Sequence, residues 1–146
     1  MGLQEKIDED LKQAMRDKAQ QKLGVLRMLK SAVKNVAIEK GAISETEIVV
    51  VIRKEISKRE DAAKSFKDGG REDLATNELA EIEVLKAYLP AGLSEAEVEK
   101  IVHDSIAEVG ATTKQQMGAV MKVAQVKAAG RVDNKTLSQL VQKLLK

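Results

Sequence analysis

The sequence predicts an all-α protein with a four-helix N-terminal lobe followed by a small three-helix C-terminal lobe. Its 146 residues are rich in Ala, Leu, Glu, Lys, Gln and Val, with one Pro, one Tyr, one Phe and no Trp. Good helix formers therefore dominate, whereas the aromatic residues typical of strands are nearly absent. Apolar residues also recur at intervals of three and four, the spacing of one helix face. Pro90 interrupts this pattern and places the lobe boundaries at residues 1–90 and 91–146.

Two helices are expected at the start of the chain. Apolar residues at helical spacing predict the first over about residues 3–18, and the same pattern continues from Leu23 to Lys40 as the second. Gly41 is the expected end of the second helix, because glycine adopts the left-handed conformation after a helix at low cost.

A capping-box pattern, formed by Ser44 and Glu47, marks the expected start of a third helix. The β-branched run at residues 48–52 follows this cap, and such a run is also compatible with a β-strand. We favour the helix because of the cap and the charged residues on both sides of the run. Gly69-Gly70 then ends it, and a fourth helix is expected over residues 71–88.

Three shorter helices are expected after the proline. The first is predicted over residues 94–110, where Ser94 and Glu97 repeat the capping-box pattern. The second is predicted over about residues 112–130, and like the first it ends at a glycine. The third follows Asp133, which is a favourable N-cap residue.

Charge is distributed unevenly along the chain, although the net charge is only +2. Residues 1–90 carry 17 basic and 17 acidic side chains, which balance. Residues 91–108 carry one base and five acids (−4), whereas residues 109–146 carry seven bases and one acid (+6). An anionic partner is therefore expected to bind the last quarter of the chain.

The sequence carries no recognisable catalytic or metal-binding pattern. Cysteine is absent, which excludes disulfides and cysteine-ligated metal sites. The one histidine, His103, has no second ligand or nucleophile at a useful spacing and is interpreted as a residue beside the apolar stripe of its helix. Gly69-Gly70 is not followed by the Lys-Ser or Lys-Thr of a phosphate-binding loop. We therefore expect no catalytic residue, no metal and no cofactor.

Charged residues of the expected third and fourth helices are interpreted as ion pairs on solvated helix faces. The acidic ones are Glu60, Asp61, Asp73, Glu78 and Glu81, and they lie among Lys58, Arg59, Lys64 and Arg71. The chain begins without the apolar core of a signal peptide, and its longest apolar run is too short to cross a bilayer. We expect a soluble cytoplasmic protein without a membrane partner.

Several short motifs occur in a characteristic order along the chain. They are Arg59-x-Asp61, Gly70-Arg71-x-Asp73-Leu74, Tyr88-Leu89-Pro90, Leu93-Ser94-Glu95, Met117-Gly118-x-Val120-Met121 and Gly130-Arg131-x-Asp133. In these motifs the chain resembles the YqeY-like (GatB/YqeY) family and is similar to the C-terminal tail region of the B subunit of the tRNA-dependent Asp/Glu amidotransferase. The resemblance implies a helical N-terminal lobe joined to a small three-helix lobe.

In that amidotransferase the corresponding tail contacts tRNA, while glutamine hydrolysis and ATP-dependent amide transfer occur elsewhere in the complex. The resemblance therefore implies an amidotransferase-related tRNA-binding accessory protein. The family is linked to carbon–nitrogen ligase activity with glutamine as amide donor, but no stand-alone catalysis is expected of this chain. The implied partners are tRNA and components of the amidotransferase or of a synthetase.

The residues expected to bind tRNA lie in the basic segment. They are Lys114, Gly118, Lys122, Lys127, Gly130, Arg131 and Lys135. The cations would contact phosphates, the glycines would allow close approach, and a helix start near Thr113 would add backbone N–H groups. No aromatic residue lies among these bases, so contacts to phosphate and RNA shape are expected rather than base stacking.

Alternatives remain open for the basic segment, for two of its residues and for the function. The segment as a whole is also explained as a solvated charged surface that binds no ligand. Gly118 is also explained by the close approach of a neighbouring helix, and Arg131 by an ion pair with Asp133. For the function, the first alternative is a protein–protein interaction adaptor with no RNA role, which docks another helix on the N-terminal lobe or on the stripe formed by Met117 and Met121. The second is a contribution to amide transfer from glutamine within a complex.

Overall fold

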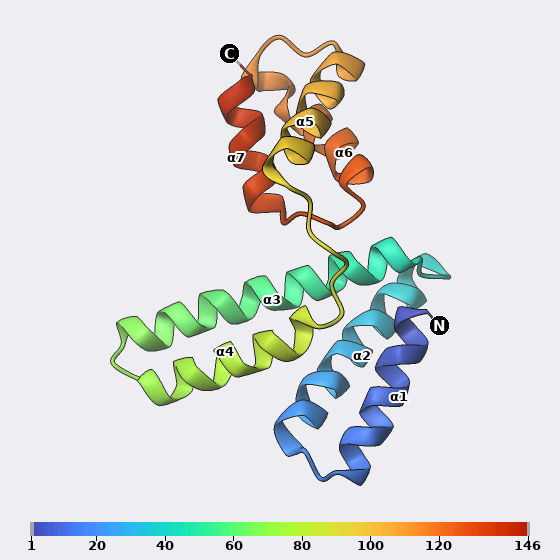
Figure 1. The fold of residues 1–146 in the computed structure, drawn as a ribbon, viewed down its shortest axis with the longest axis vertical. Helices are drawn as coiled ribbons and strands as arrows, with labels where there is room; N and C mark the ends of the chain where they lie inside the picture. The colour runs from blue at the N-terminus through green and yellow to red at the C-terminus, as the bar shows by residue number, and fades with distance from the viewer. Residues whose placement is uncertain (1, 146) are drawn as a thin grey trace. The chain divides into compact units, whose positions relative to one another are not determined.

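A computed structural model describes residues 2–145, and within that range all regular structure is helical (Figure 1). The all-α prediction is confirmed. The first four helices are α1 (Leu3–Arg16), α2 (Gln20–Lys40), α3 (Glu45–Asp68) and α4 (Glu72–Lys86). They are followed by α5 (Glu95–Val109), the 3₁₀-helix η1 (Lys114–Gln116), α6 (Met117–Ala128) and α7 (Asn134–Leu144).

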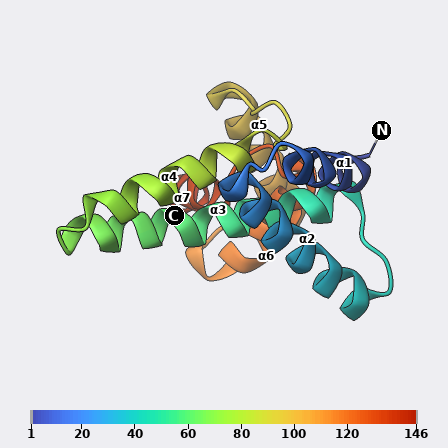
Figure 2. The same ribbon diagram turned by 90° about the horizontal axis from the view of Figure 1, so that it is seen from below.

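Packing within the chain defines two compact units, Met1–Leu89 and Pro90–Lys146. The first unit buries apolar residues of α1 to α4, including Ile7, Leu26, Ile52 and Leu85. Its α3 and α4 lie side by side as an antiparallel pair (Figures 1 and 2). The second unit has a separate core, whose fully buried residues include Val102, Val120, Ala124 and Val141. Among residues 2–145, no helix is both long and apolar enough to cross a bilayer.

The two predicted capping boxes are present. The Glu47 backbone N–H donates to Ser44 Oγ at 3.2 Å, and the Ser44 N–H donates to Glu47 Oε1 at 3.1 Å. Ser94 and Glu97 form the same reciprocal pair at the start of α5, with both distances at 3.2 Å. These bonds satisfy two of the backbone N–H groups that a helix start leaves unpaired, and they fix where α3 and α5 begin.

The β-branched run at residues 48–52 is part of α3, so the strand alternative is wrong. Ile48, Val49, Val51 and Ile52 are buried, whereas Val50 is 50% exposed. A strand would bury alternate residues of this run, but a helix buries adjacent pairs on one wide face. The observed burial is therefore helical in its spacing as well as in its backbone.

Arg59 forms a buried ion-pair cluster between α3 and α4 instead of a solvated one. Its side chain is only 10% exposed, and its Nη1 group bonds to Glu81 and lies 3.5 Å from Glu78 Oε2. The Nη2 group donates to the Met28 sulfur at 3.5 Å, and no partner for Nε is found among the described residues. The interpretation as solvated ion pairs is therefore wrong for Glu78 and Glu81, because their cationic partner lies in the interior of the helix packing.

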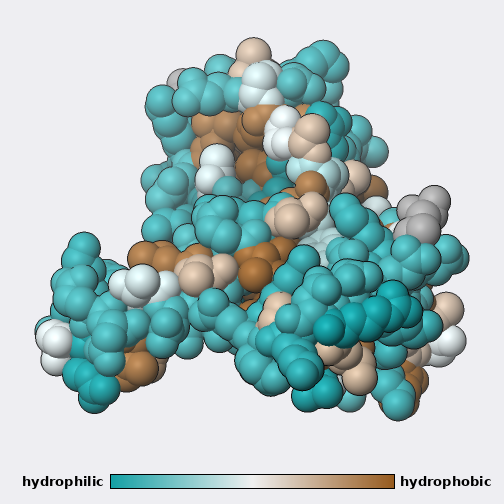
Figure 3. All heavy atoms as spheres, turned by 60° about the horizontal axis from the view of Figure 1, so that its bottom comes forward, coloured by the Kyte–Doolittle hydropathy of each residue, from teal (hydrophilic) through white to brown (hydrophobic). Residues whose placement is uncertain are grey.

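The face drawn in Figure 3 is mostly polar, and several large apolar side chains of the protein remain exposed. The exposed apolar residues are Met15, Met28, Ile38, Val50 and Leu79 in the first unit and Val126 in the second. Isolated residues of this kind are ordinary on protein surfaces, so only those beside a groove or a charged surface carry functional information.

Tyr88, the only tyrosine in the sequence, is buried at the end of the first unit. Its hydroxyl donates a hydrogen bond to Asp10 Oδ2 at 2.6 Å, and Lys6 Nζ lies 5.4 Å from its ring centre. Burial, followed by the hydrogen bond and the negative charge of Asp10, raises the pKa of Tyr88 above its ordinary value. The folded protein therefore holds the phenolic proton more tightly than the unfolded chain does.

We expect the contribution of Tyr88 to stability to be complete below about pH 10 and to decrease as the pH rises above that value. The ultraviolet absorbance of the phenolate measures this residue alone, because the chain has one tyrosine. In urea the phenolate should appear near pH 10, and in the folded protein only at higher pH. In the Tyr88→Phe variant, the free energy of unfolding should fall less than in the wild type as the pH rises above about 10. Identical titrations of the folded and unfolded protein would contradict the buried hydrogen bond.

Candidate nucleic-acid interface

The residues expected to bind tRNA all lie in the second unit. Lys114 is on η1, three of them are on α6, two are in the loop between α6 and α7, and Lys135 is in the first turn of α7. The core of this unit positions these elements, since α5, α6 and α7 pack around buried valines and Leu137. The seven residues nevertheless differ in how far they are exposed and in the partners that they have.

Lys114, Gly118 and Lys122 form what we call the basic line. All three residues are exposed: Lys114 lies on η1, and Gly118 and Lys122 are about one turn apart on the α6 helix that follows it. Within residues 2–145 neither lysine has an ion-pair partner. A Cβ atom placed on Gly118 would have no heavy atom within 4 Å. The alternative that another helix approaches Gly118 is therefore wrong for the described residues, and the backbone there is open between two lysines.

Lys127 and Arg131 have structural partners within the second unit. Lys127 Nζ lies 3.3 Å from Glu108 Oε2 on α5. Arg131 Nε donates to the carbonyl oxygen of Ala91 at 2.9 Å, and the N–H of Leu93 donates to the Arg131 carbonyl at 3.2 Å. These bonds join the segment before α5 to the loop after α6, so both side chains are less free to reach a ligand.

The ion pair suggested between Arg131 and Asp133 is not among the contacts of the described residues. Asp133 instead caps α7, with its Oδ2 accepting from the Thr136 N–H at 3.4 Å. The positive charge of Arg131 does act on Glu97, whose pKa is lowered chiefly by hydrogen bonds from Ser94 and further by this charge.

Gly130 has a conformational role. It is buried with a φ of +76°, and Ala129 before it has a φ of +50°. Two consecutive left-handed residues turn the chain sharply between α6 and α7, and glycine adopts this conformation without strain. The turn explains a glycine at this position without a ligand, and the close ligand approach expected at Gly130 stays a prediction for a residue that is buried in this structure.

The expected anion site at the helix start is also partly occupied by the protein itself. The N–H groups of Thr112 and Thr113 both donate to Gln116 Oε1, at 2.7 and 3.3 Å. An anion would have to displace this side chain to use them. The exposed lysines at this end of α6 need no such displacement to meet an anion.

A second basic element lies in the first unit and was not predicted. Helix α2 carries five bases and one acid, whereas α4 carries one base and five acids. The equal numbers of bases and acids over residues 1–90 therefore conceal one basic and one acidic helix. Counting charge for each expected helix would have found them. Two of the α2 bases are paired: Lys30 Nζ lies 3.0 Å from Asp8 Oδ1, and Lys40 Nζ lies 2.8 Å from Glu47 Oε2.

Neither unit shows the geometry of a metal centre among the described residues. His103 is exposed on α5, where its Nε2 atom lies 3.6 Å from Glu99 Oε1 one turn earlier. This pair is a surface contact within one helix, and the described part of the chain brings no group from another element to it that could form a reaction site.

Comparison with known proteins decides the family. The sequence matches the family described as "Yqey-like protein" over residues 4–145. The chain belongs to the YqeY-like family. The resemblance to this family, drawn from the ordered motifs, is thereby confirmed, and the match includes residues of both units.

Relatives of this YqeY-like protein include "Altered inheritance of mitochondria protein 41, mitochondrial" from three fungi. The Clavispora lusitaniae protein is 36% identical over 117 residues, which cover 73% of this chain and 69% of the relative. The Pyrenophora tritici-repentis protein is 27% identical over 145 residues, covering 96% and 79%. A Saccharomyces cerevisiae protein is 33% identical over 82 residues, covering 55% and 44%.

These relatives contradict the cytoplasmic location expected from the sequence, because each of them is named as mitochondrial. The expectation depended on the lack of an apolar signal-peptide core at the start of the chain. Segments that direct proteins into mitochondria are amphipathic and rich in Arg instead of continuously apolar. The missing apolar core therefore does not distinguish a cytoplasmic protein from a mitochondrial one.

Proposed function

We propose that this YqeY-like protein is an accessory protein that binds tRNA through the basic line of η1 and α6, with Lys135 as a further contact. The observation that carries the proposal is the exposure of Lys114 and Lys122 without ion-pair partners among the described residues, on either side of an open Gly118. Unpaired cations at a helical spacing suit the phosphate backbone of an RNA, which is bound largely by charge and shape.

The proposed role is accessory, and any link to amide transfer would arise through a complex with an amidotransferase or a synthetase. Lys127 and Arg131 would add to the positive field while retaining their structural bonds to Glu108 and Ala91. The names of the fungal relatives favour mitochondria as the compartment in which to look for the tRNA.

Binding of bulk tRNA across a salt series tests the proposal. We expect the affinity of the wild type to fall steeply with salt, because each neutralised phosphate releases counterions. The double variant Lys114→Gln/Lys122→Gln should bind more weakly, and the slope of log affinity against log salt should fall by about 0.7–0.9 for each phosphate that the variant no longer neutralises. Filter binding or fluorescence anisotropy measures both quantities.

The matched control is Lys64→Gln/Lys67→Gln on α3, which removes the same charge from two exposed lysines of the first unit. It should leave the slope nearly unchanged. Equal weakening in the two double variants would show that only net charge matters, and the absence of wild-type binding at low salt would refute the proposal.

Gly118→Ala adds a variant without a change of charge. Alanine is favoured over glycine inside a helix by about 1 kcal/mol, and the space at this position is open, so the variant should be more stable. If phosphate approaches the backbone there, the same variant should bind tRNA more weakly with an unchanged salt slope. Unchanged binding would remove Gly118 from the interface.

A further inference from the structure

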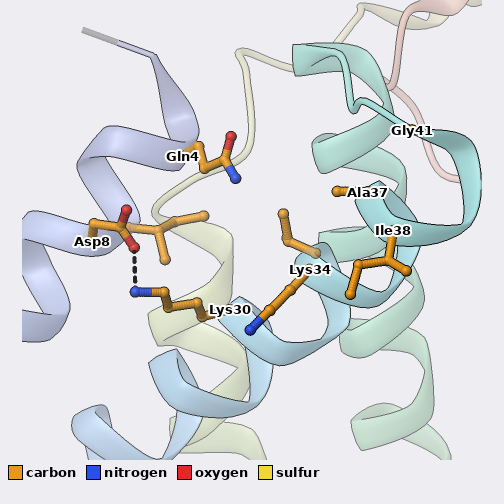
Figure 4. Close-up of a pocket in the computed structure, with 9 residues that line it drawn as sticks. Gln4, Asp8, Lys30, Lys34, Ala37, Ile38 and Gly41 are labelled. Carbon is orange, nitrogen blue, oxygen red and sulfur yellow. Dashed lines mark ion pairs between the residues drawn. The ribbon is translucent and has the colours of Figure 1, made fainter.

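A groove of about 500 Å³ lies between α1 and the C-terminal half of α2 in the first unit (Figure 4). The α2 side is one continuous stripe, formed by Lys30, Val33, Lys34, Ala37, Ile38 and Gly41. Positions spaced in this way lie on one helix face, and the stripe is about 16 Å long at 1.5 Å per residue. The groove therefore has the length of about three helical turns.

The apolar part of the groove has a buried floor and an exposed wall. Ile7 and Val33 form the floor and are only 2% and 3% exposed, because they belong to the core of the unit. Ile38 is 70% exposed, the highest value among the large apolar residues of this unit that remain at the surface. Small-molecule sites usually enclose most of their ligand. A groove with so exposed a wall would leave much of a small molecule in contact with water. An open groove with an apolar floor suits an amphipathic helix that brings its own apolar face.

The charge of the groove favours an acidic occupant. Asp8 is already paired with Lys30 at 3.0 Å, as the dashed line in Figure 4 shows. Lys34 also lines the groove, next to Ile38, and has no ion-pair partner among the described residues. The ionisable lining thus comprises two bases and one acid, on a helix that carries five bases and one acid in total. A carboxylate on a docked helix would pair with Lys34.

We propose that the α1–α2 groove docks an acidic amphipathic helix of a partner protein. Apolar side chains of that helix pack on Val33, Ala37 and Ile38, and a carboxylate beside them pairs with Lys34. The site belongs to the first unit, whereas the proposed tRNA interface belongs to the second, so the two functions are tested separately.

The test uses two designed helical peptides of about 16 residues, long enough to cover the groove. Both carry the same apolar stripe, but the flanking positions are Glu in one peptide and Lys in the other. The full-length protein should bind the acidic peptide at least about tenfold more tightly than the basic one, with amide NMR shifts centred on residues 30–41. Lys34→Glu and Ile38→Ser should each weaken binding by about tenfold.

Matched controls are Lys64→Glu and Val50→Ser, which make the same kinds of change at exposed positions outside the groove. They should leave peptide binding unchanged, and saturating tRNA should not displace the peptide. Equal binding of the two peptides, equal weakening in the controls, or shifts outside α1 and α2 would overturn the proposal. If the protein binds dodecanoate but neither peptide, the occupant of the groove is a small amphiphile and not a helix. If the protein self-associates and Lys34→Glu abolishes this self-association, the occupant of the groove is a second copy of this chain.

Discussion

Arg59→Ala should destabilise the first unit by about 3 kcal/mol, because it leaves two carboxylates partly buried without their cation. The side chains of Glu78 and Glu81 are only 22% and 24% exposed, so water replaces the guanidinium poorly. Because both carboxylates keep some contact with water, the expected destabilisation lies at the lower end of the range for breaking a buried ion pair. Urea denaturation measured by far-ultraviolet circular dichroism gives the change in unfolding free energy.

Two further variants separate charge from packing at Arg59. Lys54→Ala removes an exposed cation from the same helix and should change stability by less than about 0.5 kcal/mol. The triple variant Arg59→Met/Glu78→Gln/Glu81→Gln removes the cation and both anions, so it should be more stable than Arg59→Ala. Equal stability of Arg59→Ala and Lys54→Ala would show that the cluster contributes nothing to the fold.

Ile52→Ala should cost about 2–5 kcal/mol, since the side chain is fully buried in α3 and its removal leaves a cavity. Val50→Ala lies two residues away in the same β-branched run, but Val50 is half exposed and the change should cost little or improve helix propensity. Thermal or urea denaturation of the two variants gives the comparison. Similar destabilisation at both positions would contradict the helical burial of residues 48–52.

Helix starts could be predicted from local sequence because their physics is local. In each capping box, two residues three positions apart accept hydrogen bonds from each other's backbone N–H groups. The pairs are Ser44 with Glu47 and Ser94 with Glu97. Helix ends at Gly41 and Gly110 were predictable for the same reason, since both adopt the left-handed conformation that favours glycine.

The break between α1 and α2 was placed after about residue 18 by the apolar spacing alone, and the structure has it at residues 17–19, without a cap or glycine signal. Lys18 has a φ of +55°, and the N–H of Ala19 donates back to the Ala14 carbonyl at 3.0 Å. No Gly, Pro or Asn marks the turn, so the conformation is maintained by the packing of the two helices against the core and not by local preference. The same applies to Ala129, which is left-handed at the end of α6.

The basic segment could be located from the sequence, but the contacts of each of its residues could not. Charge counting identified η1 to α7 as the basic segment, and it found Lys114 and Lys122. It could not show that the chain near Ala91 returns to meet Arg131, since that hydrogen bond joins residues 40 positions apart. Nor could it show that Arg59 is buried, because the spacing of charges on α3 resembles that of a solvated face.

Titration of isotope-labelled protein with tRNA, observed through its backbone amide NMR signals, tests the central claim most directly. We expect the first and largest shifts at residues 112–124, around Lys114, Gly118 and Lys122, and we expect added salt to reverse them. Shifts confined to residues 2–89, or none at low salt, would contradict the assignment of tRNA binding to the second unit.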